Sequence, residues 1–270
     1  MLGKMIKHEF TATGRNFLPM YLFMIVLTPI FSLIIRIGES DVGFSPIIGL
    51  FSGISIFGFV CMMIGIFIAS YIFVIVRFYR TTATSEAYLT FTLPVSTHQI
   101  ILSKLLAAIV WQIASGILAV CAILCMTFIT GIWTPAQCMD AFISFMQQTF
   151  SHSAGTPSVR FFVLLLLTLL TGTITGTLQI YCSIMIGQLF RDHRVIGGIA
   201  VYLALYTFTQ IVSTLATLPF AIIGMEDSAY ANDVSYFTTL FVLSIVLNLV
   251  FAAVYYFASS FIMKKHLNVQ

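Results

Sequence analysis

Six apolar runs, each long enough to cross a lipid bilayer, constrain this chain more than any other feature of its sequence. A spanning helix needs about 20 mostly apolar residues, because the hydrocarbon core is about 30 Å thick and each helical residue rises about 1.5 Å. Backbone inside lipid must satisfy its own hydrogen bonds. We therefore predict an all-α integral membrane protein with six transmembrane helices in a single transmembrane domain, residues 1–270. The predicted spans are residues 17–37, 47–76, 105–133, 161–190, 195–223 and 236–263.

The composition agrees with a membrane protein and excludes several soluble classes. Of the 270 residues, 60% are hydrophobic and only 8% are charged, whereas a soluble domain carries about 25% charged residues. The net charge of +3 gives no reason to expect a polyanionic partner. We therefore exclude a soluble enzyme, a nucleic-acid-binding domain and a disordered chain.

The basic residues are divided unequally between the two sides that six spans define. Only Arg36 and Arg160 lie on the side away from the termini. The other ten are Lys4, Lys7, Arg15, Arg77, Arg80, Lys104, Arg191, Arg194, Lys264 and Lys265. Because cytoplasmic loops carry the excess of Lys and Arg, the sequence predicts that both termini face the cytoplasm.

The residues before the first span form an apolar stripe at helical spacing. Lys4, Lys7 and His8 fall mostly outside this stripe. Its members are Leu2, Met5, Ile6, Phe10 and Phe17. The pattern predicts a basic amphipathic helix over residues 2–16 that lies on the inner membrane surface. The alternative is a frayed basic terminus.

The interior of the predicted spans lacks the groups that chemistry or ion coupling would use. The middles of the spans contain no Asp, Glu, Lys, Arg or His, although ion-driven pumps and intramembrane proteases place such groups at membrane depth. The one Gly-Lys pair, Gly3-Lys4, lies too early for a phosphate-binding P-loop. We predict a protein that is not an enzyme, has no metal site and no cofactor of its own, and takes energy from another chain.

Four uncharged amides, one in each of the last four spans, are the candidates for lining a substrate path. They are Gln112, Gln179, Gln210 and Asn248. The alternative is that they join helices by hydrogen bonds, which contribute about 0.6 kcal/mol each.

Two glycine pairs at a spacing of four residues indicate close helix approach. They are Gly49 with Gly53 and Gly172 with Gly176. Small residues at this spacing let helix backbones come near one another in a membrane. The sequence therefore predicts tight packing at these two places, without naming a dimer face.

The polar stretch between the second and third spans predicts a short helix held outside the bilayer. Ser85 suits its N-terminus and Pro94 ends it. Apolar residues in this water-facing segment need a partner, either the bilayer surface or another protein. They are Tyr88, Leu89, Phe91 and Leu93. The following Ser96-x-x-Gln99 is a capping box, which predicts that the third span begins at Thr97.

This stretch resembles the loop after the second span in permease subunits of ATP-binding cassette (ABC) exporters, the type-2 permease family. It reads Glu86-x-Tyr-Leu-x-x-x-Leu-Pro-Val-Ser-x-x-x-Ile-Ile-Leu-Ser-Lys104. The family pattern is roughly an acid, Leu, then Leu-Pro-[Val/Ile]-Ser, an aliphatic run and Gly-Lys. This chain has Ser103 before Lys104 where glycine is commoner, and Ala87-Tyr88-Leu89 where many members have Gly-Thr-Leu. Residues 1–18 are also similar to the N-terminal elbow helix of such permeases.

The resemblance implies a cytoplasmic coupling helix that docks in a groove of a separate ABC ATPase subunit. The implied contact residues are Glu86, Tyr88, Leu89, Phe91, Leu93 and Pro94. Such exporters contain two permeases and two ATPases. The resemblance therefore implies ATP and Mg in the ATPase subunit, a second permease copy or a paralogue as partner, and a multi-pass protein of the bacterial plasma membrane.

The combined sequence evidence favours an exporter permease subunit over one rival. A span interior without charges suits an amphipathic or hydrophobic cargo, such as a peptide toxin or a peptide antibiotic. The alternative is a non-transporting membrane scaffold or sensor that recruits a cytoplasmic partner. Only the exporter requires a separate ATPase.

The loop between the third and fourth spans, residues 134–160, predicts an amphipathic helix at the outer membrane surface. Its apolar residues recur at helical spacing, and Gln137, Asp140 and Gln147 fall elsewhere. The apolar residues are Met139, Phe142, Ile143, Met146 and Phe150. Such a helix either helps to close the outer exit of a path or simply rests on the bilayer.

Overall fold

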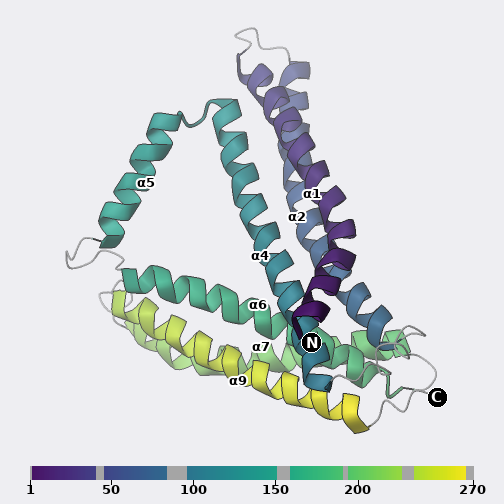
Figure 1. Cartoon of the computed structure of the whole chain (residues 1–270). Helices are drawn as coiled ribbons and strands as arrows, with labels where there is room; N and C mark the ends of the chain where they lie inside the picture. The colour runs from purple at the N-terminus through teal and green to yellow at the C-terminus, as the bar shows by residue number, and fades with distance from the viewer. Residues whose placement is uncertain are drawn as a thin grey trace. The chain divides into compact units, whose positions relative to one another are not determined.

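The computed structural model describes residues 2–40, 46–83, 96–150, 159–190, 194–226 and 234–265. These residues form seven helices and nothing but short turns between them (Figure 1). The helices are α1 (Leu2–Ser40), α2 (Pro46–Ala83), α4 (Thr97–Thr130), α5 (Pro135–Phe150), α6 (Val159–Gly187), α7 (Arg194–Glu226) and α9 (Val234–Lys265).

Six of these helices are long and apolar enough to cross a membrane, which confirms the predicted all-α class and the number of spans. The exception is the 16-residue α5, which occupies the loop where an amphipathic helix was predicted. Most of the spanning helices extend beyond the predicted spans. Helix α2, for example, continues to Ala83, because residues 77–83 contain no glycine or proline that would end it.

A separate elbow helix is not found among the described residues. Residues 2–16 are helical, but they belong to one unbroken helix, α1, that continues to Ser40 with Pro19 and Pro29 inside it. No residue near position 16 stops the helix. The hydroxyl groups of Thr11 and Thr13 bond back to the carbonyls of Lys7 and Glu9 at 3.0 and 2.7 Å, as they do within a continuous helix.

The capping box before α4 is confirmed. The Ser96 amide donates to Gln99 Oε1 at 3.3 Å, and the Gln99 amide donates to Ser96 Oγ at 3.4 Å. Helix α4 consequently begins at Thr97, where the sequence predicted it. The predicted coupling helix, with its six candidate contact residues, falls in residues 84–95 and lies outside the described residues.

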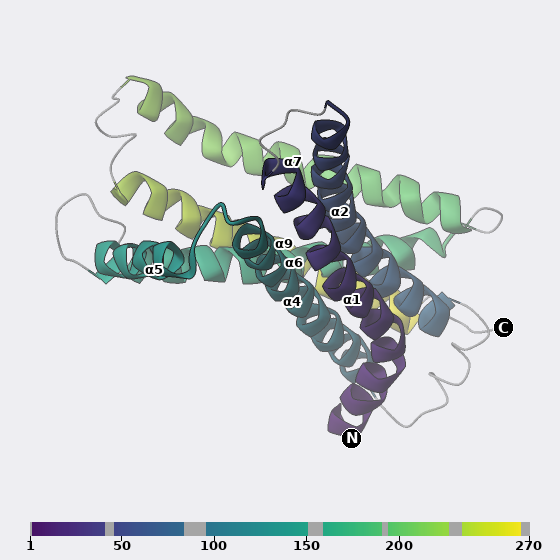
Figure 2. The same cartoon turned by 90° about the horizontal axis from the view of Figure 1, so that it is seen from above.

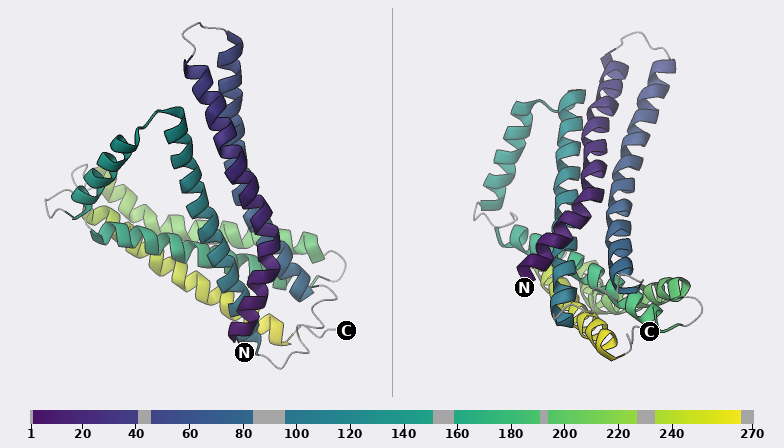
Figure 3. Two further views of the ribbon diagram at one scale, coloured as in Figure 1. Left: turned by 45° about the horizontal axis from the view of Figure 1, so that its top comes forward. Right: turned by 45° about the vertical axis from the view of Figure 1, so that its right-hand side comes forward.

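The chain divides into two compact units. Unit 1 comprises Met1–Arg77 and Leu106–Ile143, and it contains α1 with most of α2 and α4. Its core is formed by Met24, Phe59, Ile66, Ala119 and Ala122. Further methionines surround this core, and their flexible side chains fill gaps between unevenly shaped helix faces. They are Met20, Met62, Met63 and Met126. The views agree that α1 and α2 run side by side (Figures 1 and 3).

Unit 2 comprises Phe78–Leu105 and Ser144–Gln270, and its framework is α6, α7 and α9 (Figure 2). Helices α6 and α9 run parallel, since Phe161 packs on Phe241 with ring centroids 5.1 Å apart and Thr175 bonds to the Asn248 carbonyl 2.9 Å away. Helix α7 packs mainly against α6 and runs in the opposite direction. Tyr181, Cys182 and Met185 of α6 are buried, so the C-terminal half of α6 is the centre of the unit.

The tight packing predicted at the two glycine pairs is wrong for the described structure. A Cβ atom built at Gly172 or Gly176, or at either member of the other pair, would meet nothing within 4 Å. The close approach lies instead at the end of α6. There, a Cβ on Gly187 would stand 2.5 Å from Gly198 Cα of α7. Spacing alone cannot distinguish a glycine that meets a neighbour from one that faces open space.

Candidate functional site

The four predicted path residues are divided between the two units. Gln112 belongs to unit 1, whereas the other three belong to unit 2. Within unit 2, Gln179 is buried, Asn248 is half-buried and Gln210 is exposed. The Gln179 Nε2 atom is buried without a hydrogen-bond partner in the described part of the chain. Asn248 joins helices through its main-chain carbonyl, which accepts a bond from Thr175 Oγ1.

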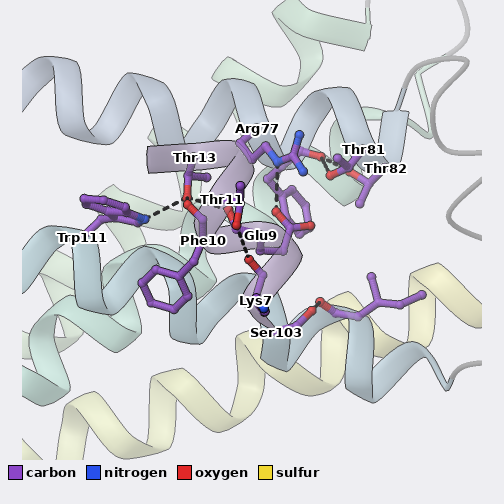
Figure 4. A network of polar contacts seen from close by, with 12 residues as sticks. Lys7, Glu9, Phe10, Thr11, Thr13, Arg77, Thr81, Thr82, Ser103 and Trp111 are labelled. Atoms are coloured by element: carbon purple, nitrogen blue, oxygen red, sulfur yellow. Dashed lines mark hydrogen bonds and ion pairs between the residues drawn. The ribbon is translucent and has the colours of Figure 1, made fainter. Parts of the chain in front are cut away.

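The main polar contact of unit 1 is a chain of hydrogen bonds around Trp111 that joins α1, α2 and α4. We call it the Trp111 junction. Trp111 Nε1 donates to Thr13 Oγ1 of α1 at 2.8 Å (Figure 4). Tyr21 Oη lies 3.0 Å from the Trp111 carbonyl and 2.8 Å from Ser115 Oγ. Ser70 of α2 completes the chain, because its Oγ lies 3.0 Å from Ser115 Oγ.

Aromatic rings enclose the Trp111 junction. Phe17 stacks on the indole of Trp111 with centroids 4.8 Å apart and planes 12° from parallel. Phe10 and Tyr21 tilt against the same indole, each at 6.0 Å. These rings cover the hydrogen-bonded groups only in part, since Thr13, Tyr21 and Trp111 are all half-buried.

An ion pair ties the same part of α1 to α2. Arg77 Nε lies 2.9 Å from Glu9 Oε2, and the Glu9 side chain is only 11% exposed (Figure 4). A shielded carboxylate needs such a partner, since an unpaired buried charge is strongly destabilising. The ion pair and the Trp111 junction together fix the first five turns of α1 against its neighbours, where the sequence predicted a helix on the membrane surface.

The hydrogen bond between Trp111 and Thr13 predicts that these two residues stabilise unit 1 jointly. We expect Trp111→Phe and Thr13→Val to be coupled by about 0.6–1.7 kcal/mol, the usual range for such bonds in membranes. A double-mutant cycle of unfolding free energies in lipid measures this coupling. In the control cycle, Trp111→Phe is paired with Thr127→Val, whose hydroxyl bonds only within α4. That pair should be additive, and equal coupling in both cycles would disprove the contact.

Hydroxyl groups also join the helices of unit 2. Thr209 of α7 bonds to Tyr255 Oη of α9. Because Thr209 Oγ1 already donates to the Leu205 carbonyl at 2.7 Å, the Tyr255 hydroxyl is the donor in this contact. This contact lies among buried residues of α6 and α9, including Cys182 and Ser259.

A second polar cluster of unit 2 lies where α4 begins and α9 ends. His98 Nδ1 is 2.8 Å from Tyr256 Oη, and Lys264 Nζ is 3.3 Å from His98 Nε2. We call these three residues the His98 cluster. His98 is half-buried and Lys264 is exposed, so water reaches the cluster.

Helix α7 presents polar side chains to its surroundings at the middle of its length. Tyr206, Gln210 and Thr214 follow one another at intervals of four residues, which places them on one side of the helix, and all three are exposed. We call them the polar face of α7. The exposed Leu203 lies on the same side, and the opposite side carries the exposed apolar residues Phe208 and Leu215. In its most apolar 18-residue window, none of α7 is buried.

Sequence reasoning selected amides and missed the hydroxyl, indole and imidazole groups that join the helices. No sequence signal separates these groups from their neighbours, because most serine and threonine hydroxyls bond within their own helix. Thr28, for example, donates to the Met24 carbonyl at 2.8 Å. Among the described residues, no three His, Cys, Asp or Glu side chains gather as a metal site would require.

The chain was compared with protein families, curated proteins and solved structures. No protein-family model, no curated protein and no solved structure matches the chain.

Proposed function

We propose that this chain is the membrane-spanning subunit of an ATP-driven exporter in a bacterial plasma membrane, with both termini in the cytoplasm. It moves an amphipathic or hydrophobic cargo, such as a peptide toxin or a peptide antibiotic. ATP and Mg bind to a separate ABC ATPase subunit that docks on residues 84–95. A second copy of the permease, or a paralogue, completes the path.

The polar face of α7 is the observation that carries the proposal of a path. Gln210 lies at the midpoint of a helix that is apolar enough to span a membrane. Lipid tails offer no hydrogen bond to its amide, and an unsatisfied amide in hydrocarbon is costly. A path that contains water or polar cargo removes this cost. In a scaffold, the same amide would instead have to bond to a helix of a partner chain.

The chemistry of the face also supports the class of cargo. Tyr206 and Gln210 offer an aromatic surface and neutral hydrogen-bonding groups, and the middle of α7 contains no charged residue. Neutral donors and acceptors beside apolar surface suit a molecule with both characters, such as a hydrophobic peptide. They give no counter-ion for a highly charged cargo.

Cysteine labelling tests whether the polar face of α7 lines such a path. With the five native cysteines replaced, a membrane-impermeant thiol reagent should modify Gln210→Cys in lipid vesicles several times faster than Phe208→Cys. The two positions are two residues apart on one helix and are both exposed, so they differ mainly in which side of α7 they occupy. Tyr206→Cys should behave like the first, and Leu215→Cys like the second. Equal labelling on the two sides of α7 would contradict a path at this face.

A further inference from the structure

The exposed side of α1 is basic near the N-terminus and apolar farther along the helix. Its residues recur at intervals of three or four, which keeps them on one side. In order, these exposed residues are Lys4, Lys7, Thr11, Arg15, Leu18, Leu22 and Val26. We call Lys4, Lys7 and Arg15 the basic face of α1. The three apolar residues that continue it are 50–65% exposed, as lipid-facing residues are in a spanning helix.

Neighbouring helices of unit 1 cover the opposite side of α1. Glu9 pairs with Arg77 of α2, and Thr13 accepts a hydrogen bond from Trp111 of α4 (Figure 4). Glu9 is the only acid in residues 1–38. The one carboxylate in this part of the sequence therefore points away from the basic face and contacts a cation of its own.

Charges and aromatic residues place the basic face at one edge of the bilayer. The 20 residues between Arg15 and Arg36 carry no charge, and 20 helical residues rise about 30 Å, which is the thickness of the hydrocarbon core. Trp111 indicates the same edge, because tryptophan is enriched at the interface and a Cβ on Gly14 would stand 3.4 Å from its ring. Arg15 therefore lies at the headgroups, and the two lysines lie about two and three turns farther from the core.

An anionic phospholipid has the chemistry that matches both parts of this surface. Side chains on a helix point toward its N-terminus, so the Arg15 guanidinium extends from the hydrocarbon edge into the headgroup layer. Its planar donors fit a phosphate. Lys7 and Lys4 add an attraction that falls with distance, since screening acts over about 8 Å at physiological ionic strength. The exposed Leu18 and Leu22 suit acyl chains, which a free phosphate ion does not have.

We propose that the basic face of α1 selects anionic phospholipids in the leaflet nearest the N-terminus. Arg15 binds the headgroup phosphate, the two lysines strengthen the attraction, and the acyl chains lie on Leu18 and Leu22. Under the proposed topology this leaflet is the inner one. The bound lipid covers the side of α1 that the Trp111 junction leaves open. This inference goes beyond the proposed function and requires no ATPase.

Quenching of a tryptophan reporter by brominated lipids tests this selection in vesicles of phosphatidylglycerol and phosphatidylcholine. Both native tryptophans, Trp111 and Trp133, are replaced by phenylalanine, and Leu18→Trp places the reporter one turn from Arg15. Brominating one lipid at a time gives the ratio of the two lipids beside the reporter. We expect phosphatidylglycerol to be enriched about fivefold, the effect of one basic residue near an anionic membrane surface.

Leu33→Trp is the matched reporter near the other end of α1. Leu33 is also exposed, and it stands three residues before Arg36, as the first reporter stands three residues after Arg15. The sequence places the acids Glu39 and Asp41 within five residues of Arg36, and a carboxylate repels an anionic headgroup. We therefore expect no enrichment of phosphatidylglycerol at this reporter.

Removal of charge from the basic face should abolish the enrichment. At the Leu18→Trp reporter, the triple variant Lys4→Gln, Lys7→Gln and Arg15→Gln should bring the ratio near one, and Arg15→Gln alone should cause most of the loss. Arg36→Gln should leave the ratio unchanged. Enrichment that survives in the triple variant, or equal ratios at the two reporters, would overturn the proposal. So would loss of the enrichment when inorganic phosphate replaces chloride at equal ionic strength, because the site would then bind the free ion.

Thermal unfolding in detergent provides a second test if the chain without its native tryptophans does not fold. Added phosphatidylglycerol should raise the midpoint of the unaltered protein more than phosphatidylcholine does. The triple variant should respond equally to the two lipids, whereas Arg36→Gln should keep the difference. Equal responses of the unaltered protein would refute the selection. No ATPase takes part in either experiment, so failure of the proposed function would leave both results unchanged.

Discussion

Gly187→Ala is expected to destabilise unit 2 by about 3 kcal/mol, because the added methyl group has no place to go. A Cβ at this position would lie 2.5 Å from Gly198 Cα and 2.6 Å from Gly198 N. Both are backbone atoms, so no side chain can rotate away, and α6 and α7 must separate. In a thermal unfolding experiment in detergent, a loss of this size lowers the midpoint by about 6–12 °C.

The other glycine of this contact provides a closely matched control variant. Gly198→Ala changes the other glycine of the pair, but its Cβ would meet only the Ser183 carbonyl, at an ordinary 3.7 Å. Gly176→Ala, on the same helix as Gly187, would meet nothing within 4 Å. Both controls should keep the wild-type midpoint within a few degrees. If Gly187→Ala is as stable as Gly198→Ala, the close approach of α6 and α7 is not present in the protein.

Tyr88→Ala and Phe91→Ala should each weaken binding of the proposed ATPase by about 2 kcal/mol or more, which is about thirtyfold in Kd. Truncating an aromatic anchor removes one of the two largest apolar side chains that a docking groove would cover. The membrane fold should persist, because residues 84–95 lie between the spans rather than inside them. Pull-down of the ATPase by the full-length permease, with a thermal midpoint as folding control, measures the effect.

A variant of α5 serves as the control for this experiment. Gln147→Ala changes a polar residue of α5, which the predicted topology places on the outer side of the membrane. It should leave both ATPase pull-down and ATP turnover of the complex unchanged. Full retention of the ATPase by the Tyr88→Ala and Phe91→Ala variants would exclude this segment as the docking element. The segment would then be a helix that rests on the bilayer.

Residues 2–16 show that an amphipathic pattern does not identify what a helix packs against. The sequence predicted a separate helix on the membrane surface, whereas these residues are the first turns of α1. The apolar stripe of those residues is real, but it does not lie against lipid alone. Phe10 and Phe17 contact Trp111 of α4, while Glu9 pairs with Arg77 of α2. An amphipathic pattern states that one side of a helix is covered. It does not state whether lipid or protein covers it.

The sequence by itself determined the features that depend on neighbouring residues. Hydrophobic length determined the six spanning helices, and the spacing of Ser96 and Gln99 determined where α4 begins. The periodicity of residues 139–150 likewise determined that α5 is helical. Each of these follows from bonds within one helix or one cap, so the relevant partners are at most a few positions apart.

Only the tertiary structure decided which helices meet and through which groups. Trp111 finds Thr13 across 98 positions, and His98 finds Tyr256 across 158. In lipid, an apolar side chain gains little more from a neighbouring helix than from an acyl chain, so hydrophobicity does not choose the partner. Which helices pack together is decided by close backbone contact at a glycine such as Gly187 and by a few hydrogen bonds. Both depend on the distances between helices, and a single sequence does not contain those distances.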